Sequence, residues 1–201
     1  MNRSILHLDL DSFFVSVERL INGELKKRPL LVGGISDRGV VAACSYETRA
    51  FGVHSGMPMK LARRLCPEAI VLRGNSGTYT KYSDLITEII KSEVPAFEKA
   101  SIDEFYADLS GMDQFFGTYK FASELRTKII RESGLPISLG LSINKIVSKV
   151  ATGEAKPNNQ IKIDQGYEKQ FLAPLPIRKI PMIGDKTGLT LQRLGIRIVS
   201  D

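Results

Sequence analysis

The order of apolar patterns along the chain constrains its fold more than any other feature. An apolar run over residues 5–10 predicts a strand, and apolar residues then recur at helical spacing to about residue 21. Later patterns predict a helix over 74–93, two strands around a tight turn within 96–110, a helix over 119–132 and a strand over 136–143. Together with the opening strand, this is the split βαβ order of a ferredoxin-like α+β fold.

Residues 13–74 predict a second, smaller α+β unit that is inserted after the first strand. The apolar runs "RPLLVGG" and "GVVAACS" lie on either side of a turn at 36–39, which predicts a hairpin. A short helix that ends before Pro67 and the short strand "AIVLRG" complete the unit.

Carboxylates lie where two strands of the larger fold are expected to meet. In the split βαβ order the first and third strands are antiparallel neighbours, so the end of the first meets the start of the third. This brings Asp9 beside Asp103 and Glu104. Three carboxylates so close raise one another's pKa values unless a cation neutralises them, and oxygen ligands alone favour Mg²⁺ or Mn²⁺. The alternative for Asp103 and Glu104 is a polar hairpin turn, which leaves Asp9 unexplained.

Asp11 has two interpretations. It shares the face of Asp9 only if the strand continues through it. If the chain turns at Leu10, Asp11 becomes an acid at the N-terminus of the following helix, where the helix dipole favours a negative charge. We favour this second role.

Composition limits the class of protein. The apolar fraction of 43% is typical of globular proteins, and no apolar run approaches the ~20 residues that span a bilayer. The first residues lack a signal-peptide pattern and there are two cysteines, so we expect a soluble, cytoplasmic protein with reduced thiols and no membrane partner. The net charge of +6 lies in local basic patches, which suit either a polyanionic partner or a solvated surface.

Five stretches resemble the Y-family, the translesion DNA polymerases, and most closely their bacterial DNA polymerase IV branch. They cover nearly the whole chain in the family's order, which makes the resemblance specific. The stretches are "DLDSFFVSVE" (9–18), "SYETRAFGV" (45–53), "SIDEFYADLS" (101–110), "GLSINKIVSKVATGEAKPN" (140–158) and "IPMIGDKTGLTLQRLGI" (180–196).

The resemblance implies a division into named domains. Residues 1–12 and 75–163 would form the palm, 13–74 the fingers, and 164–201 part of a helical thumb with a helix-hairpin-helix. The family's C-terminal little-finger domain is absent from this chain. We therefore expect an N-terminal catalytic fragment that binds DNA weakly.

The resemblance also implies the reaction, in which a primer 3′-hydroxyl attacks the α-phosphate of a deoxynucleoside triphosphate with the help of two metal ions. Mg²⁺ is the expected ion, with Mn²⁺ as its substitute. Asp9, Asp103 and Glu104 would be the catalytic metal ligands, with the Leu10 carbonyl as a further oxygen.

Five residues would bind the incoming nucleotide: Phe13, Phe14, Tyr46, Arg49 and Lys156. By resemblance, Phe14 lies under the sugar as a steric gate against a ribose 2′-hydroxyl. The alternative is that both phenylalanines are buried anchors of a helix. Tyr46 and Arg49 are one helical turn apart, so both reach one side, and resemblance assigns them to the β- and γ-phosphates. Lys156 would be a third triphosphate contact.

The stretch 180–196 has the character of a helix-hairpin-helix, a motif that holds a DNA phosphate without reading bases. Gly184, Lys186 and Gly188 are the expected contacts, and a simple helix pair with a glycine cap is the alternative. The implied partners are primer-template DNA, deoxynucleoside triphosphates and, for the full-length protein, a sliding clamp.

Two other functions compete with polymerisation. A nucleotidyl cyclase on a similar palm would share the metal-binding carboxylates but would have no use for the hairpin motif or the basic patches. A non-catalytic DNA-binding module would have no need of all three carboxylates.

Overall fold

A central five-stranded sheet organises the computed structural model, which describes residues 3–112 and 117–201. Its strand order is β5-β6-β1-β7-β8, and β1 is antiparallel to both of its neighbours, β6 and β7. The strands are β1 (Ile5–Leu10), β5 (Phe97–Lys99), β6 (Glu104–Asp108), β7 (Ile137–Ser142) and β8 (Gln160–Lys162).

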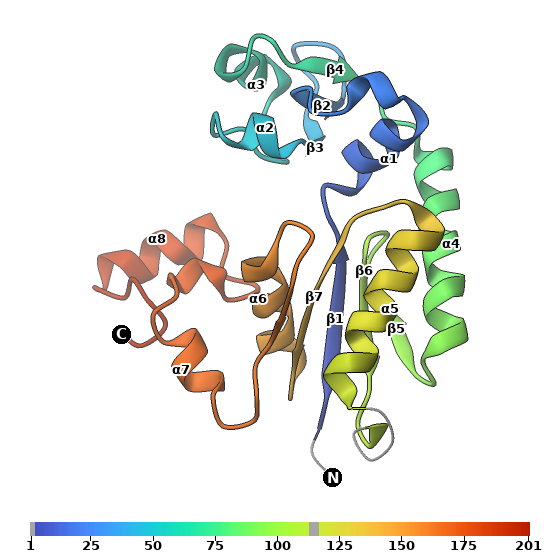
Figure 1. Ribbon diagram of the computed structural model, residues 1–201. Helices are drawn as coiled ribbons and strands as arrows, with labels where there is room; N and C mark the ends of the chain where they lie inside the picture. The colour runs from blue at the N-terminus through green and yellow to red at the C-terminus, as the bar shows by residue number, and fades with distance from the viewer. Residues whose placement is uncertain (1–2, 113–116) are drawn as a thin grey trace.

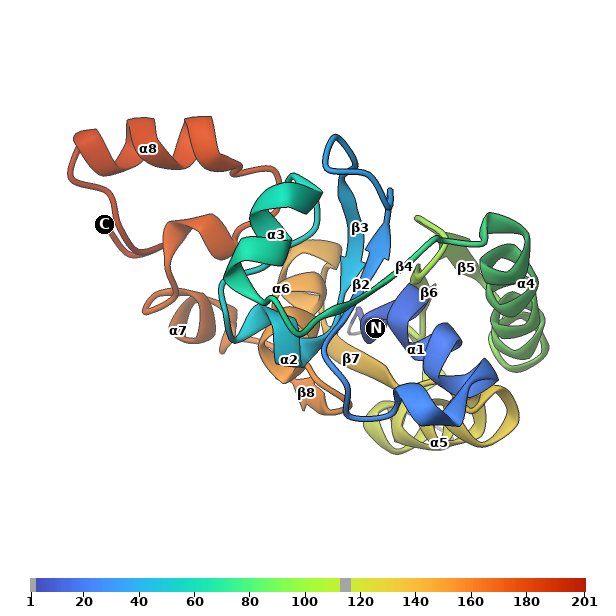
Figure 2. The same ribbon diagram turned by 90° about the horizontal axis from the view of Figure 1, so that it is seen from above.

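Helices cover both faces of this sheet. Helices α4 (Ser76–Glu93) and α5 (Thr118–Ser133) lie on one face, and α6 (Lys145–Ala155) lies on the other, as Figures 1 and 2 show from two directions. Since β1 is at the centre, its side chains are buried on both faces. Leu6, Leu8 and Leu10 belong to the main apolar core, whereas the alternate residue His7 contacts α6.

The inserted unit lies at the top of Figure 1 and is built on a separate three-stranded sheet in the order β3-β2-β4. Strand β2 is antiparallel to β3 and parallel to β4. The unit comprises α1 (Phe13–Ile21), the 3-10 turn η1 (Gly23–Leu25), β2 (Leu30–Gly33), β3 (Val41–Cys44), α2 (Tyr46–Arg49), α3 (Met59–Leu65) and β4 (Ile70–Leu72). Leu31 faces a small second core with Met59 and both cysteines, whereas Leu30 and Val32 belong to the main core. Strand β2 therefore joins the two cores.

The C-terminal segment lies beside α6, at the left of Figure 1. It consists of α7 (Glu168–Leu172), a 3-10 turn η3 (Ile177–Lys179) and α8 (Asp185–Arg193). Gly188 is its one buried residue within these helices, so this segment packs much less tightly than the sheet. None of the helices in the described part of the chain is both long and apolar enough to cross a membrane.

The predicted α+β class and strand order are confirmed. The antiparallel pairing of the first and third strands and the hairpin of the inserted unit are present as predicted. The division into palm, fingers and thumb stays a prediction.

Candidate active site

The register of β1 and β6 brings carboxylates together at one end of the sheet. Asp9 lies directly opposite Glu104, and the Leu10 N–H donates to the Asp103 carbonyl at 3.0 Å. The predicted approach of Asp9 to residues 103–104, far apart in sequence, is therefore confirmed.

Two lysines neutralise the facing carboxylates. Lys156 Nζ binds Asp9 Oδ1, and Lys149 Nζ binds Glu104 Oε1. Lys149 lies in α6 and Lys156 directly follows its last residue, seven positions further on, and both reach the same edge of the sheet. The pairing of Lys149 with Glu104 was not predicted from the sequence.

The candidate metal ligands are suitable in kind but are not gathered around one point. Among residues 3–112 and 117–201, no three His, Cys, Asp or Glu side chains form a group able to hold a metal ion. The Asp103 carboxylate accepts a hydrogen bond from Ser101 Oγ at 2.7 Å. Asp9, Asp103, Glu104 and the Leu10 carbonyl offer only oxygens, which is the chemistry that Mg²⁺ and Mn²⁺ require. Their role as metal ligands stays a prediction.

The environment displaces the pKa values of the two facing carboxyls in opposite directions. Burial raises the pKa of Asp9 to about 7; Asp103 and Glu104 act the same way, while Lys156 opposes them. Burial also acts to raise the pKa of Glu104, but the hydrogen bond and charge of Lys149 outweigh it and the pKa is lowered. Such a separation of two neighbouring carboxyls is typical of catalytic sites.

His7 is a polar residue behind the site that sequence analysis did not single out. It is 1% exposed, and its Nδ1 lies 2.8 Å from Thr152 Oγ1 on α6. Burial lowers its pKa to about 3, so the ring is neutral near pH 7, although Nε2 is 3.8 Å from Glu104 Oε1. A histidine inside an otherwise apolar strand was the available signal.

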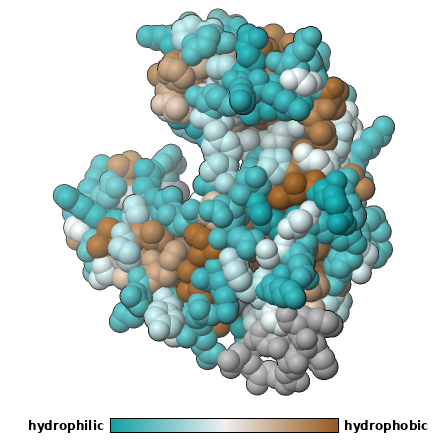
Figure 3. Space-filling view, in the orientation of Figure 1, coloured by the Kyte–Doolittle hydropathy of each residue, from teal (hydrophilic) through white to brown (hydrophobic). Residues whose placement is uncertain are grey.

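A small cavity of about 160 Å³ separates the carboxylates from the inserted unit. Figure 3 shows the hollow between the upper unit and the layers below it. Seven of the predicted site residues line this cavity, and they come from both units of the chain: Asp9, Leu10, Phe13, Phe14, Arg49, Asp103 and Lys156. The structure therefore brings most of the predicted site together.

The adjacent phenylalanines have different surroundings. Phe13 is 3% exposed and belongs to the main core, whereas Phe14 is partly exposed. The Phe14 ring stacks on Tyr79 of α4, with 4.2 Å between centroids and 12° between planes. Tyr79 is itself held by donating to Glu18 at 2.7 Å. Phe14 thus presents a supported ring to the cavity.

Tyr46 and Arg49 lie on the one-turn helix α2, which the Ser45 side chain caps. The Arg49 guanidinium carbon lies over the Tyr46 ring, 5.2 Å from its centroid. The Tyr46 hydroxyl donates to Asp11 Oδ1 at 3.3 Å, and burial followed by the charge of Asp11 raises the pKa of Tyr46. Arg49 lines the cavity while Tyr46 lies behind it.

The preferred interpretation of Asp11 as a helix N-terminal acid is wrong. Helix α1 begins at Phe13 and has no acid in its first turn. Ser12 takes a left-handed conformation before it, with φ 43°. The Asp11 carboxylate instead lies against β7 and accepts hydrogen bonds from Ser138 Oγ and the Asn158 N–H. The Asp11 N–H donates to the Pro136 carbonyl at 2.9 Å, so the pairing with the β7 segment continues one residue beyond β1 and keeps Asp11 beside that segment.

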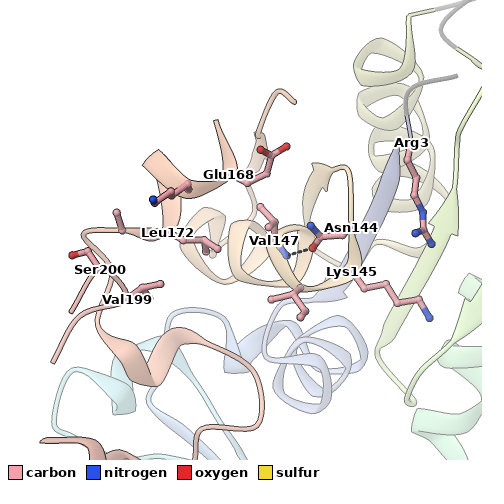
Figure 4. Close-up of a pocket in the computed structure, with 11 residues that line it drawn as sticks. Arg3, Asn144, Lys145, Val147, Glu168, Leu172, Val199 and Ser200 are labelled. Atoms are coloured by element: carbon pink, nitrogen blue, oxygen red, sulfur yellow. Dashed lines mark hydrogen bonds between the residues drawn. The ribbon is translucent and has the colours of Figure 1, made fainter. Parts of the chain in front are cut away.

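The predicted DNA contacts lie at the start of α8. Gly184 precedes the helix, Lys186 is exposed in its first turn, and Gly188 packs against Arg178. A groove of about 590 Å³ is lined both by Gly184 and by Asp9, so this segment borders the candidate site. A different groove, of about 800 Å³, lies between α6, α7 and the last residues and contains none of the predicted site residues (Figure 4).

Known proteins resemble this chain over most of its length. The model of the impB/mucB/samB family matches residues 8–153. A "DNA polymerase IV" of Dehalococcoides mccartyi (strain CBDB1) is 45% identical over 196 residues, which are 96% of this chain and 50% of that protein. A "DNA polymerase IV" of Treponema denticola is 42% identical over 194 residues, with 96% and 49% covered. The chain spans about half the length of these curated relatives.

Solved structures of similar proteins superpose on this chain. The crystal structure of DinB from Sulfolobus solfataricus superposes with a TM-score of 0.90 at 31% identity, covering 97% of this chain and 58% of that one. An insertion ternary complex of Dbh DNA polymerase gives 0.88 at 31% identity, with the same coverage.

Proposed function

Because the chain belongs to the impB/mucB/samB family, we propose that it carries the catalytic centre of a translesion DNA polymerase of the Y-family. In this proposal it adds deoxynucleotides to a primer 3′-end on a template strand, in DNA damage tolerance. The observation that carries the proposal is the pairing of Asp9 with Glu104 beside a cavity lined by Phe14, Arg49 and Lys156.

Divalent metal ions are a general requirement of DNA polymerases, and we propose two Mg²⁺ ions held by Asp9, Asp103, Glu104 and the Leu10 carbonyl. Bound there, they would activate the primer hydroxyl and stabilise the leaving pyrophosphate. Lys149 and Lys156 keep the acids close together by neutralising them. Lys156 would then exchange its carboxylate partner for the more highly charged triphosphate, since it already lines the cavity.

The remaining cavity residues would orient the nucleotide. Phe14 would lie under the deoxyribose, and the stacked Tyr79 would keep its ring from yielding to a 2′-hydroxyl. Arg49 would bind the β- and γ-phosphates, where a guanidinium gives two parallel charge-assisted hydrogen bonds, and Tyr46, whose hydroxyl donates to Asp11, would support Arg49 there. The first N–H groups of α1, near Phe13, lack partners within the helix and suit the same anion.

Primer-template DNA would occupy the groove between α6 and the start of α8. Gly184, where a Cβ would meet nothing within 4 Å, would allow close approach of backbone to phosphate. Gly188 would let Arg178 pack against the helix, and Lys186 would supply charge. For the whole protein we propose a sliding clamp as a further partner and a place on DNA in the cytoplasm.

Primer extension by the 201-residue chain tests the proposal. With Mg²⁺, a labelled primer-template and all four deoxynucleotides, we expect extension that Asp103→Ala abolishes. The control is Asp108→Ala, which removes an exposed carboxylate at the other end of β6 and should leave extension unchanged.

Two other outcomes would contradict the proposal. A cyclic nucleotide formed without DNA would identify a cyclase. DNA binding with no metal-dependent extension would identify a non-catalytic module.

A further inference from the structure

Asp11 lies where three separate parts of the chain meet. The residue is 2% exposed, and its carboxylate accepts a hydrogen bond from each part. Ser138 Oγ on β7 lies 3.0 and 2.9 Å from the two carboxylate oxygens, the Asn158 N–H donates to Oδ2 at 2.7 Å, and the Tyr46 hydroxyl donates to Oδ1 at 3.3 Å.

These hydrogen bonds stabilise the buried carboxylate of Asp11. A carboxylate removed from water is costly unless hydrogen bonds replace its hydration. None of the ion pairs within residues 3–112 and 117–201 includes Asp11, so neutral donors do this work. Its backbone is fixed as well, because the Asp11 N–H donates to the Pro136 carbonyl at 2.9 Å and its own carbonyl accepts from Ser16 Oγ at 2.6 Å. The side chain is therefore held in one place.

Through Tyr46, Asp11 reaches the inserted unit. The hydrogen bond fixes the phenol end of the ring, and Arg49 lies over the face of that ring. Helix α2 is a single turn, too short to hold its side chains by itself. The position of Arg49 at the cavity thus depends on a contact with the end of β1.

Through Asn158, Asp11 reaches the segment that carries Lys156. Asn158 is two residues after Lys156, and Arg126 of α5 holds the same residue from the other side through its carbonyl and side-chain oxygen, at 2.5 and 2.6 Å. Lys156 extends from this braced segment to Asp9 and the cavity.

We propose that Asp11 is a positioning residue for triphosphate binding, which sets Arg49 through Tyr46 and Lys156 through Asn158. The inference rests on the proposed function, because it assigns the cavity to a deoxynucleoside triphosphate. One buried carboxylate thereby aligns phosphate-binding groups that belong to two different units of the chain.

The test compares Asp11→Asn with Tyr46→Phe and with the double variant. Asparagine keeps the shape but presents an amide N–H₂ to donors, so at least one contact is lost. We expect Asp11→Asn to raise the KM for deoxynucleotides about tenfold while kcat falls less than about threefold. The affinity for a fluorescent deoxynucleoside triphosphate, measured without primer, should weaken to the same degree. In the Tyr46→Phe background, Asp11→Asn should raise KM by a clearly smaller factor than it does in the wild type.

Leu141→Val is the control for lost stability, since it alters the core at the opposite end of β7 from Ser138. It should lower Tm and leave KM unchanged. If Asp11→Asn lowers Tm but leaves both KM and nucleotide affinity unchanged, or if its effect on the Tyr46→Phe background is undiminished, the positioning role is refuted. If the wild-type chain neither extends a primer nor binds the nucleotide, the proposed function itself fails and the inference falls with it.

Discussion

At the scale of residues, the neighbouring Phe14 and Phe13 have different places in the structure. The Phe14 ring borders the cavity and stacks on Tyr79, which holds the ring from behind. Phe13, directly before it, serves the core instead.

Phe14→Ala should therefore admit ribonucleotides. Removing the ring opens space where a 2′-hydroxyl would collide, and we expect the ratio of ribonucleotide to deoxynucleotide incorporation to rise at least about tenfold. Single-nucleotide insertion kinetics with matched rNTP and dNTP measure it. Phe51→Ala, which truncates an exposed phenylalanine of the same unit, is the control. Unaltered sugar discrimination in Phe14→Ala would remove the residue from this role.

Burial of Asp9 lowers the stability of the folded protein when the carboxyl is ionised, and its raised pKa gives the direction in which stability changes with pH. The pKa of about 7 lies above the ordinary value of 3.8, so the folded state binds more protons than the unfolded state between these values. Stability from this group therefore falls as pH rises from about 4 to about 7.

Asp9→Asn should remove that fall, because asparagine does not ionise. We expect the variant to exceed the wild type by about 1–2 kcal/mol near pH 8, and the difference to vanish near pH 4. The full pKa shift of Asp9 corresponds to about 4 kcal/mol. The expected gain is smaller because Lys156 loses its charged partner in the variant. Urea unfolding at the two pH values checks this, and a gain that persists at low pH would mean that titration of Asp9 is not its source.

At the scale of elements, α6 connects the sheet to the site. It approaches β7 so closely that a Cβ on Gly140 would collide with the Ser148 carbonyl and lie 2.6 Å from the Thr152 nitrogen. The close approach allows Lys149, on the same helix, to reach Glu104.

Gly140→Ala should force α6 outward and destabilise the protein by about 1–3 kcal/mol, as overpacking does. Gly153→Ala is the matched control within α6, since its Cβ would meet nothing within 4 Å. That variant should gain about 0.5–1 kcal/mol through helix propensity. Thermal unfolding of both proteins tests the pair, and equal changes in Tm would contradict the close packing of α6 on β7.

Sequence predicted the elements well where a period or a turn signal was strong. The apolar run over 5–10 and the two long helices were sufficient to predict the strand order of the main sheet, and the turn at 36–39 was sufficient to predict the hairpin of the inserted unit. From that order alone, the approach of Asp9 to Glu104 followed. The pairing of Lys149 with Glu104 did not, because it depends on how closely α6 packs on the sheet. Asp11 was misassigned for a related reason, since its pairing with Pro136 extends the strand contact one residue beyond Leu10.

At the scale of the whole molecule, positive charge borders the groove that leads to the carboxylates. Arg178 and Lys179 line it together with Lys149 and Lys156, and Lys186 lies just beyond it at the start of α8. Helix α5 is on the other side of the molecule (Figure 2). Each of the four cations that line the groove forms an ion pair with a carboxylate of the chain, so a duplex that runs along the groove would replace those carboxylates with its phosphates.

Lys186→Ala should weaken binding of primer-template DNA alike for all sequences, because a phosphate contact reads no bases. We expect the slope of log K against log salt to become shallower by about 0.9, the value for one released counterion. Lys120→Ala, on the exposed surface of α5 beside Glu124, is the control. It removes one positive charge, as Lys186→Ala does, and should leave the slope as in the wild type. Fluorescence anisotropy with a labelled duplex at several salt concentrations measures both. Equal slopes for Lys186→Ala and Lys120→Ala would mean that the start of α8 is not where the duplex backbone binds.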